Sequence, residues 1–172
     1  FAAIVDLLAD KRRPLWATGG RFTQFCAEML QAHLYQLRPN CRAVTYTPAG
    51  RADGLLDVSK RDVFIVFDLR RYQKDTVDLT HAAKARGATI VLVTDAWLSP
   101  IADIADHVLT VDVESPSPYD SMVPGIALVE ALIAGVVVKL GPSTRQRISN
   151  LERLREGYTW DDRTFAFDGE DD

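Results

Sequence analysis

The chain has 172 residues, of which 47% are hydrophobic and 26% are charged, and this suits one compact globular domain with an ample core. Its formal net charge of −4 gives no support for a nucleic-acid surface, so any contact with DNA would need a part outside this sequence. The two cysteines, Cys26 and Cys41, are too few for a disulfide framework and fit a reducing cytoplasm.

The first third of the chain predicts two strands and two helices. Apolar residues at helical spacing indicate a helix over residues 1–8, and residues 15–18 form a short strand that ends in Gly19-Gly20. Residues 42–47 alternate as a second strand. Between the strands, residues 22–37 carry the i, i+3, i+4 pattern of an amphipathic helix, whose expected buried stripe is Phe22, Phe25, Cys26, Met29, Leu30, His33, Leu34 and Leu37.

The middle of the chain is organised around the apolar run at residues 63–67. This run has five consecutive β-branched or aromatic residues, as expected for a strand buried on both faces. We expect a loop over 48–54 and a short helix over 55–59 before it. After it come the polar residues 68–72, and then a helix from about Asp75 that ends before Gly87.

The last part of the chain predicts two more strands, over 89–94 and 107–113. A short helix lies between them, with Ser99 as its cap and Pro100 as its first residue, and it continues to Ala105. Residues 114–120 form a loop rich in proline and serine. We expect Ser121 to cap a long apolar helix that ends at Gly141-Pro142, and a final helix to cover 145–156.

The long helix from Ser121 is apolar on all sides, so we expect it to be covered on all sides, in part by a second subunit. Glu130 lies in its middle, which favours a buried helix over a membrane span. The tail at residues 158–172 is acidic and lies outside the predicted domain of residues 1–157.

Five strands separated by helical segments predict an α/β fold, a three-layer α/β/α sandwich around a five-stranded parallel sheet. In the flavodoxin-like order 2-1-3-4-5, the first and third strands flank the point where the strand order reverses. The loops that leave these strands, 19–23 and 68–72, should then face each other and form the ligand site.

Four segments in this order resemble the SIS (sugar isomerase) domain, in the version found in RpiR/MurR-family transcriptional regulators. The resemblance is carried by Gly19-Gly20-Arg21-Phe22-Thr23, by residues 65–76, by residues 87–102, and by residues 106–113 with the helix after Ser121. Together they span residues 1–155. The sequence begins at Phe1 without a signal-like segment, so it is similar to a piece of a longer protein.

The resemblance implies a cytoplasmic homodimer, which could associate further into a tetramer, with a pocket for a sugar phosphate, a sugar acid or a related anion. It also implies that DNA is bound by an N-terminal helix-turn-helix domain outside this sequence and that no membrane is involved. Where the family's phosphate loop offers two serines, a glycine and a threonine, this chain has Asp68, Arg70, Arg71 and Gln73. An altered ligand or a weakened site follows, in which Asp68 either holds Arg70 or Arg71 or accepts hydrogen bonds from sugar hydroxyls. The predicted ligand-binding residues are Gly19, Gly20, Arg21, Thr23, Asp68, Arg70, Arg71, Tyr72 and Gln73.

We expect a non-catalytic effector-sensing and dimerisation domain without a cofactor or a metal, because the histidines are scattered and no nucleophile–base pattern is visible. One alternative is an aldose–ketose phosphosugar isomerase with Glu28, Glu114 or Glu130 as the base. Another is a degenerate SIS module that only dimerises, with the crevice closed by a pair between Asp68 and Arg70 or Arg71. Thr94, Asp95 and Ser99 are interpreted as turn and cap residues rather than ligand contacts.

Overall fold

A five-stranded parallel sheet forms the centre of the computed structural model, which describes residues 1–44 and 47–155. The strand order is β2-β1-β3-β4-β5, which confirms the predicted fold. The strands are β1 (Leu15–Gly19), β2 (Cys41–Ala43), β3 (Val63–Phe67), β4 (Thr89–Thr94) and β5 (His107–Thr110). The helices are α1 (Ala2–Ala9), α2 (Gln24–Leu37), α3 (Pro48–Leu55), α4 (Lys74–Ala85), the short 3₁₀ helix η1 (Pro100–Asp103), α5 (Val123–Leu140) and α6 (Pro142–Arg155).

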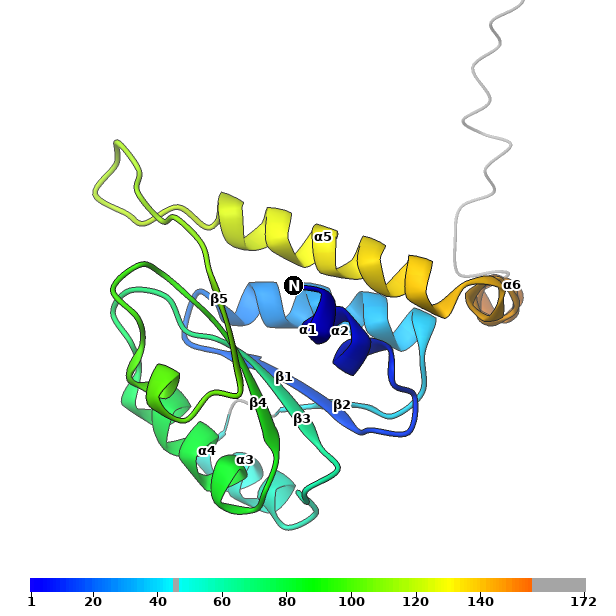
Figure 1. Cartoon of the computed structure of the whole chain (residues 1–172), viewed down its shortest axis with the longest axis horizontal. Coiled ribbons are helices and arrows are strands. Elements are labelled where there is room, and N and C mark those ends of the chain that lie inside the picture. The colour runs from blue at the N-terminus through cyan, green and yellow to red at the C-terminus, as the bar shows by residue number, and fades with distance from the viewer. Residues whose placement is uncertain (45–46, 156–172) are drawn as a thin grey trace, which may run out of the picture.

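The helices lie on both faces of the sheet (Figure 1). Helices α1, α2 and α5 are on one side, where α5 crosses over α1 and α2, and helices α3 and α4 are on the other. Gly135 of α5 packs so closely on Val5 of α1 that a Cβ at Gly135 would lie 2.8 Å from a Val5 methyl group. Small residues at this crossing therefore let the two helices approach.

Alternation along the central strands supplies both halves of the core. In β3, Val63, Ile65 and Phe67 face the α1, α2 and α5 side, whereas Phe64 and Val66 face the α3 and α4 side. All five are buried, as predicted for a strand covered on both faces.

The register of the two central strands places their ends side by side. Gly19, the last residue of β1, is paired with Phe67, the last residue of β3. The loops after these strands therefore leave the sheet at the same edge, as predicted from the strand order.

Several predicted boundaries are corrected by the structure. Residues 48–55 are helical instead of a loop, because Thr47 caps this helix by accepting the Gly50 N–H at 3.2 Å and Pro48 starts it; the helix predicted over 55–59 is absent. Strand β2 begins at Cys41, and residues 45 and 46 of the predicted strand lie outside the described residues. Strand β5 ends at Thr110, and α6 starts at Pro142. The predicted tail and Glu156 also fall outside the described residues.

The apolar stripe predicted for α2 is partly wrong. Phe22 and Phe25 are 57% and 65% exposed, because the helix begins only at Gln24 and buries Cys26, Leu30 and Leu34 instead. His33 is also exposed. The two phenylalanines thus form part of an outer surface.

Helix α5 is packed on its inner face only. Gly125, Val129, Leu132 and Val136 are buried, but the outer face is exposed and mostly apolar: Val123, Ile126, Ala127, Glu130, Ala131, Ala134, Val137, Val138 and Lys139. By length and composition it is one helix, among the described residues, that could cross a membrane. Its contacts with α1 and α2 are those of a helix that belongs to the sandwich. Ser121 accepts the Val123 N–H at 3.3 Å, one residue before the cap position at Met122.

Candidate functional site

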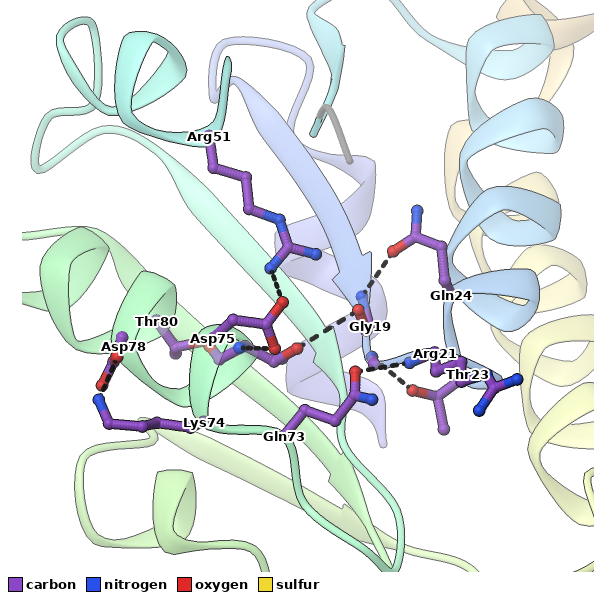
Figure 2. A network of polar contacts seen from close by, with 12 residues as sticks. Gly19, Arg21, Thr23, Gln24, Arg51, Gln73, Lys74, Asp75, Asp78 and Thr80 are labelled. Atoms are coloured by element: carbon purple, nitrogen blue, oxygen red, sulfur yellow. Dashed lines mark hydrogen bonds and ion pairs between the residues drawn. The ribbon is translucent and has the colours of Figure 1, made fainter. Parts of the chain in front are cut away.

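The β1–α2 turn is held by side chains of its own helix (Figure 2). The Gly19 N–H donates to Gln24 Oε1 at 2.9 Å, and the Gly20 N–H donates to Thr23 Oγ1 at 2.7 Å. Thr23 Oγ1 in turn donates to the Phe67 carbonyl at 2.6 Å. Thr23 and Gln24 are buried, so these two amides are enclosed within the protein.

The third amide of the turn is reached from the neighbouring loop. The Arg21 N–H donates to Gln73 Oε1 at 2.7 Å, and Figure 2 shows the Gln73 side chain crossing from the start of α4 to the turn. A Cβ at Gly20 would lie 3.1 Å from the same Gln73 oxygen. Gly20 thus leaves room for the carboxamide to lie against the main chain.

The β3–α4 loop begins with a buried carboxyl group. Asp68 is 1% exposed and accepts a hydrogen bond from Ser99 Oγ at 2.5 Å, while its main-chain carbonyl accepts one from Thr94 Oγ1 at 2.8 Å. Burial raises the pKa of Asp68, and the hydrogen bond from Ser99 partly opposes this. Among the described residues no ion pair joins Asp68 to Arg70 or Arg71, so the expectation that Asp68 holds either arginine is wrong.

Asp95, at the end of β4, fixes the middle of this loop. Its carboxylate accepts the Arg70 main-chain N–H at 2.5 Å, the Tyr72 hydroxyl at 2.7 Å and the Trp97 N–H at 2.9 Å. Burial, together with the hydrogen bond to Asp95, raises the pKa of Tyr72. Asp95 and Ser99 are thus turn and cap residues, as predicted, and their side chains also support the candidate site.

The two arginines of the loop are displayed by this framework. Arg71 has φ = +67°, a left-handed conformation that favours glycine. The Arg70 guanidinium lies 4.8 Å from the centre of the Trp97 ring and 3.5 Å from an Asp120 oxygen. Trp97 and Asp120 come from different loops, so both limit where Arg70 can point.

Most of the predicted residues line one pocket of about 540 Å³. It is lined by Gly20, Arg21, Phe22, Thr23, Asp68, Leu69, Arg70, Arg71, Gln73, Tyr119, Asp120 and Met122. Gly19 and Tyr72, which were also predicted, are not in its lining. A second hollow of about 690 Å³ adjoins the first, shares Arg70, Arg71, Tyr119 and Asp120 with it, and is otherwise formed by residues 114–118.

The loop between β5 and α5 is the part of the site that sequence reasoning missed. It brings Tyr119 and Asp120 to the pocket and Glu114 to the second hollow. Its proline- and serine-rich composition indicates a loop, but nothing local indicates that it reaches the β3–α4 loop. Phe22 and Met122 were likewise assigned to other roles.

The candidate bases for an isomerase do not converge. Glu28 and Glu130 are exposed on α2 and α5, and neither lines the pocket. At the start of α4, Asp75 pairs with Arg51 at 2.7 Å (Figure 2), so this helix N-terminus already has a carboxylate beside it. Within the described residues no group of three or more His, Cys, Asp or Glu side chains is arranged to hold a metal ion.

Comparison with known proteins agrees with this geometry. The SIS domain family matches residues 7–135. The sugar isomerase domain of an RpiR transcription factor from Sphaerobacter thermophilus superposes with a TM-score of 0.80 at 26% identity, over 88% of this chain and 84% of that one. Comparison with curated protein sequences gives no match.

Two more distant structures share the fold and contain sugar phosphates. The Vibrio vulnificus NanR protein, complexed with ManNAc-6P, has a TM-score of 0.75 at 14% identity, over 93% of this chain and 61% of that one. The E. coli CFT073 protein c3406, in complex with a sugar phosphate, has a TM-score of 0.69 at 19% identity, over 84% of this chain and 80% of that one. Since the family profile covers most of the chain and the sheet has the matching order, the chain belongs to the SIS domain family.

Proposed function

We propose that this chain is the ligand-sensing and dimerisation domain of a cytoplasmic RpiR-type transcriptional regulator. Its effector is a small anionic carbohydrate derivative, and DNA is contacted by a separate N-terminal helix-turn-helix domain. The observation that carries the proposal is the pocket at the edge of β1 and β3, lined by Arg21, Arg70 and Arg71. Guanidinium groups pair well with carboxylates and phosphates.

The relatives support the class of ligand. The RpiR domain is a regulator domain, and the NanR and c3406 structures contain sugar phosphates. The pocket volume of about 540 Å³ lies in the range of ordinary small-molecule sites. We therefore place the effector among sugar phosphates, sugar acids and related anions.

Dimerisation is supported by the outer face of α5. This face is apolar over most of the helix, with Val138 82% exposed, and α2 adds the exposed Phe25, with Phe22 just before it. Contiguous exposed apolar surface on this scale marks an interaction site, and a second copy of the chain is the partner that we propose. Two such dimers could form a tetramer.

A sensing role is favoured over catalysis by the placement of the carboxylates. An isomerase needs a base beside the sugar carbons, yet Glu28 and Glu130 lie outside the pocket and Glu114 lines only the second hollow. Asp68 is held by Ser99 at the pocket floor. Solved neighbours described as putative phosphosugar isomerases keep catalysis as the alternative to test, by assaying aldose–ketose interconversion on every sugar phosphate that binds.

The ligand is tested by a thermal-shift screen against sugar phosphates, sugar acids, free sugars and small carboxylates. A ligand at about a hundred times its dissociation constant adds about 2.7 kcal/mol to the stability, which raises the melting temperature by several degrees. Arg70→Ala and Arg71→Gly should each weaken binding about 30-fold, since a charged hydrogen bond contributes about 2 kcal/mol. Arg86→Ala, an exposed arginine at the other end of α4, should bind normally.

The dimer is tested by sedimentation velocity of two matched variants. Val138→Glu, which puts a charge on the outer face of α5, should reduce the mass from twice 19.1 kDa to that of one chain. Leu56→Glu alters a residue of similar exposure, 80%, just after α3 on the other side of the sheet, and should remain dimeric. A stable dimer without any ligand across the screen would instead favour a module that only dimerises.

A further inference from the structure

Three consecutive main-chain amides line the inner end of the pocket, and each one is already bonded. Converging main-chain N–H groups at a turn are a common anion site. Two of the three, at Gly19 and Gly20, are enclosed by buried side chains of Thr23 and Gln24. The amide of Arg21 is different because its acceptor, Gln73, belongs to another loop, lines the pocket and is only half-buried.

Gln73 therefore occupies the position that a ligand oxygen would take at this amide. Its Oε1 atom accepts the Arg21 N–H at 2.7 Å and would lie 3.1 Å from a Cβ at Gly20. No side-chain cap bond ties Gln73 to its own helix, although it stands at the N-cap of α4. Its carboxamide is committed to the neighbouring turn.

With this amide taken, the donors left to an anion are mainly the guanidinium groups of Arg21, Arg70 and Arg71. A phosphate has three terminal oxygens arranged tetrahedrally, so it needs donors from several directions. A carboxylate is planar and can be satisfied by one bidentate guanidinium. Arg70 already lies 3.5 Å from a carboxylate, that of Asp120.

We propose that Gln73 is a specificity-determining residue that fills the amide-lined end of the pocket and thereby makes the site prefer a carboxylate, as in a sugar acid, over a phosphate. The inference rests on the proposed function, because it assumes that an anion binds between the two loops. It goes further by naming the anion and the residue that selects it.

The test uses Gln73→Ser and two simple probes, inorganic phosphate and acetate, titrated into ¹⁵N-labelled protein and followed by NMR. Serine is a favourable N-cap residue, so the variant should fold. Removing the carboxamide frees the Arg21 N–H, and phosphate affinity should rise about tenfold, the effect of one added hydrogen bond to a charged group. Acetate affinity should change less than about twofold, since its guanidinium partners remain.

A purely structural role for Gln73 would move both affinities together and would leave their ratio unchanged, which would overturn the proposal. A wild-type Arg21 amide signal that responds to phosphate as strongly as in Gln73→Ser would also overturn it. Gln73→Glu is the matched control: it keeps an oxygen on the Arg21 N–H and should gain no phosphate binding.

Failure of this inference is separable from failure of the proposed function. If Gln73→Ser gains no phosphate affinity while a ligand in the thermal-shift screen still depends on Arg70, the specificity role of Gln73 is rejected and the sensing role stands. If no anion binds any variant, both are rejected.

Discussion

The two loops that meet at the pocket are built in opposite ways. The β1–α2 turn bonds mainly to its own helix, through Thr23 and Gln24. The β3–α4 loop is held from outside, by Asp95 and Ser99 of the segment that follows β4. The first loop is thus a compact scaffold, whereas the second depends on distant side chains to present its arginines.

This difference separates keeping a shape from choosing a ligand. Gly19 can be only glycine, because a Cβ there would lie 2.7 Å from main-chain atoms of Thr23 and Gln24. In the β3–α4 loop, by contrast, Arg70 and Arg71 belong to the pocket lining, where they can be exchanged without altering the sheet. Variation in the ligand is therefore expected in the second loop.

The largest expected effect is that of Gly19→Ala. The added methyl group meets main-chain atoms that cannot move away, so we expect the free energy of unfolding to fall by about 3 kcal/mol. Gly20→Ala is the matched control, because its Cβ would meet only the end of the Gln73 side chain, and should cost less than about 1 kcal/mol. Urea denaturation of both variants measures this, and equal losses would contradict a scaffold role specific to Gly19.

A smaller effect is expected for Asp95→Asn. The new amide group would face either the Arg70 N–H or the donors from Tyr72 and Trp97, so one buried donor loses its acceptor and stability should fall by about 2 kcal/mol. Because the Arg70 main chain is then released, affinity for the effector should fall as well. Asp103→Asn, an exposed acid in η1, should change stability by less than about 0.5 kcal/mol. Loss of stability without any loss of affinity would show that Asp95 does not position Arg70.

The sheet was predictable because its strands are encoded locally. Continuous apolar runs such as Val63–Phe67 identify the strands, and Gly87 ends α4 in a left-handed conformation, φ = +90°, as predicted. The error over residues 48–59 has a physical reason. Thr47-Pro48 is a cap and first-turn pair like Ser99-Pro100, but glycines at 50 and 54 weaken the helical pattern.

The site was predictable in its place but not in its contacts. Strand order alone brings the two loops together. The bond from Arg21 to Gln73 joins residues 52 positions apart, and that from Arg70 to Asp95 joins residues 25 positions apart. No local pattern encodes such pairs. The exposure of Phe22 and Phe25 was missed because a helical stripe does not say which of two apolar faces meets the sheet.

The smallest predicted effect concerns Asp68 and is seen as a pH dependence. Burial raises its pKa above the ordinary value of 3.8, so the folded protein holds this proton more tightly than the unfolded chain. Stability from this group is therefore greatest at low pH and is lost as the pH rises above 3.8 towards the raised pKa. Asp68→Asn has no proton to lose, so its stability relative to the wild type should increase between about pH 4 and about pH 7.

Ser99→Ala provides the opposing variant. The Ser99 hydroxyl stabilises the charged carboxylate, so its removal should raise the pKa further and make the loss of stability with pH steeper than in the wild type. Urea denaturation at several pH values should then rank the slopes in the order Ser99→Ala, wild type, Asp68→Asn. Equal slopes would mean that the carboxyl at the pocket floor is as well solvated in the folded protein as in the unfolded chain, and that the β3–α4 loop has no stability cost of its own to set against the self-contained turn beside it.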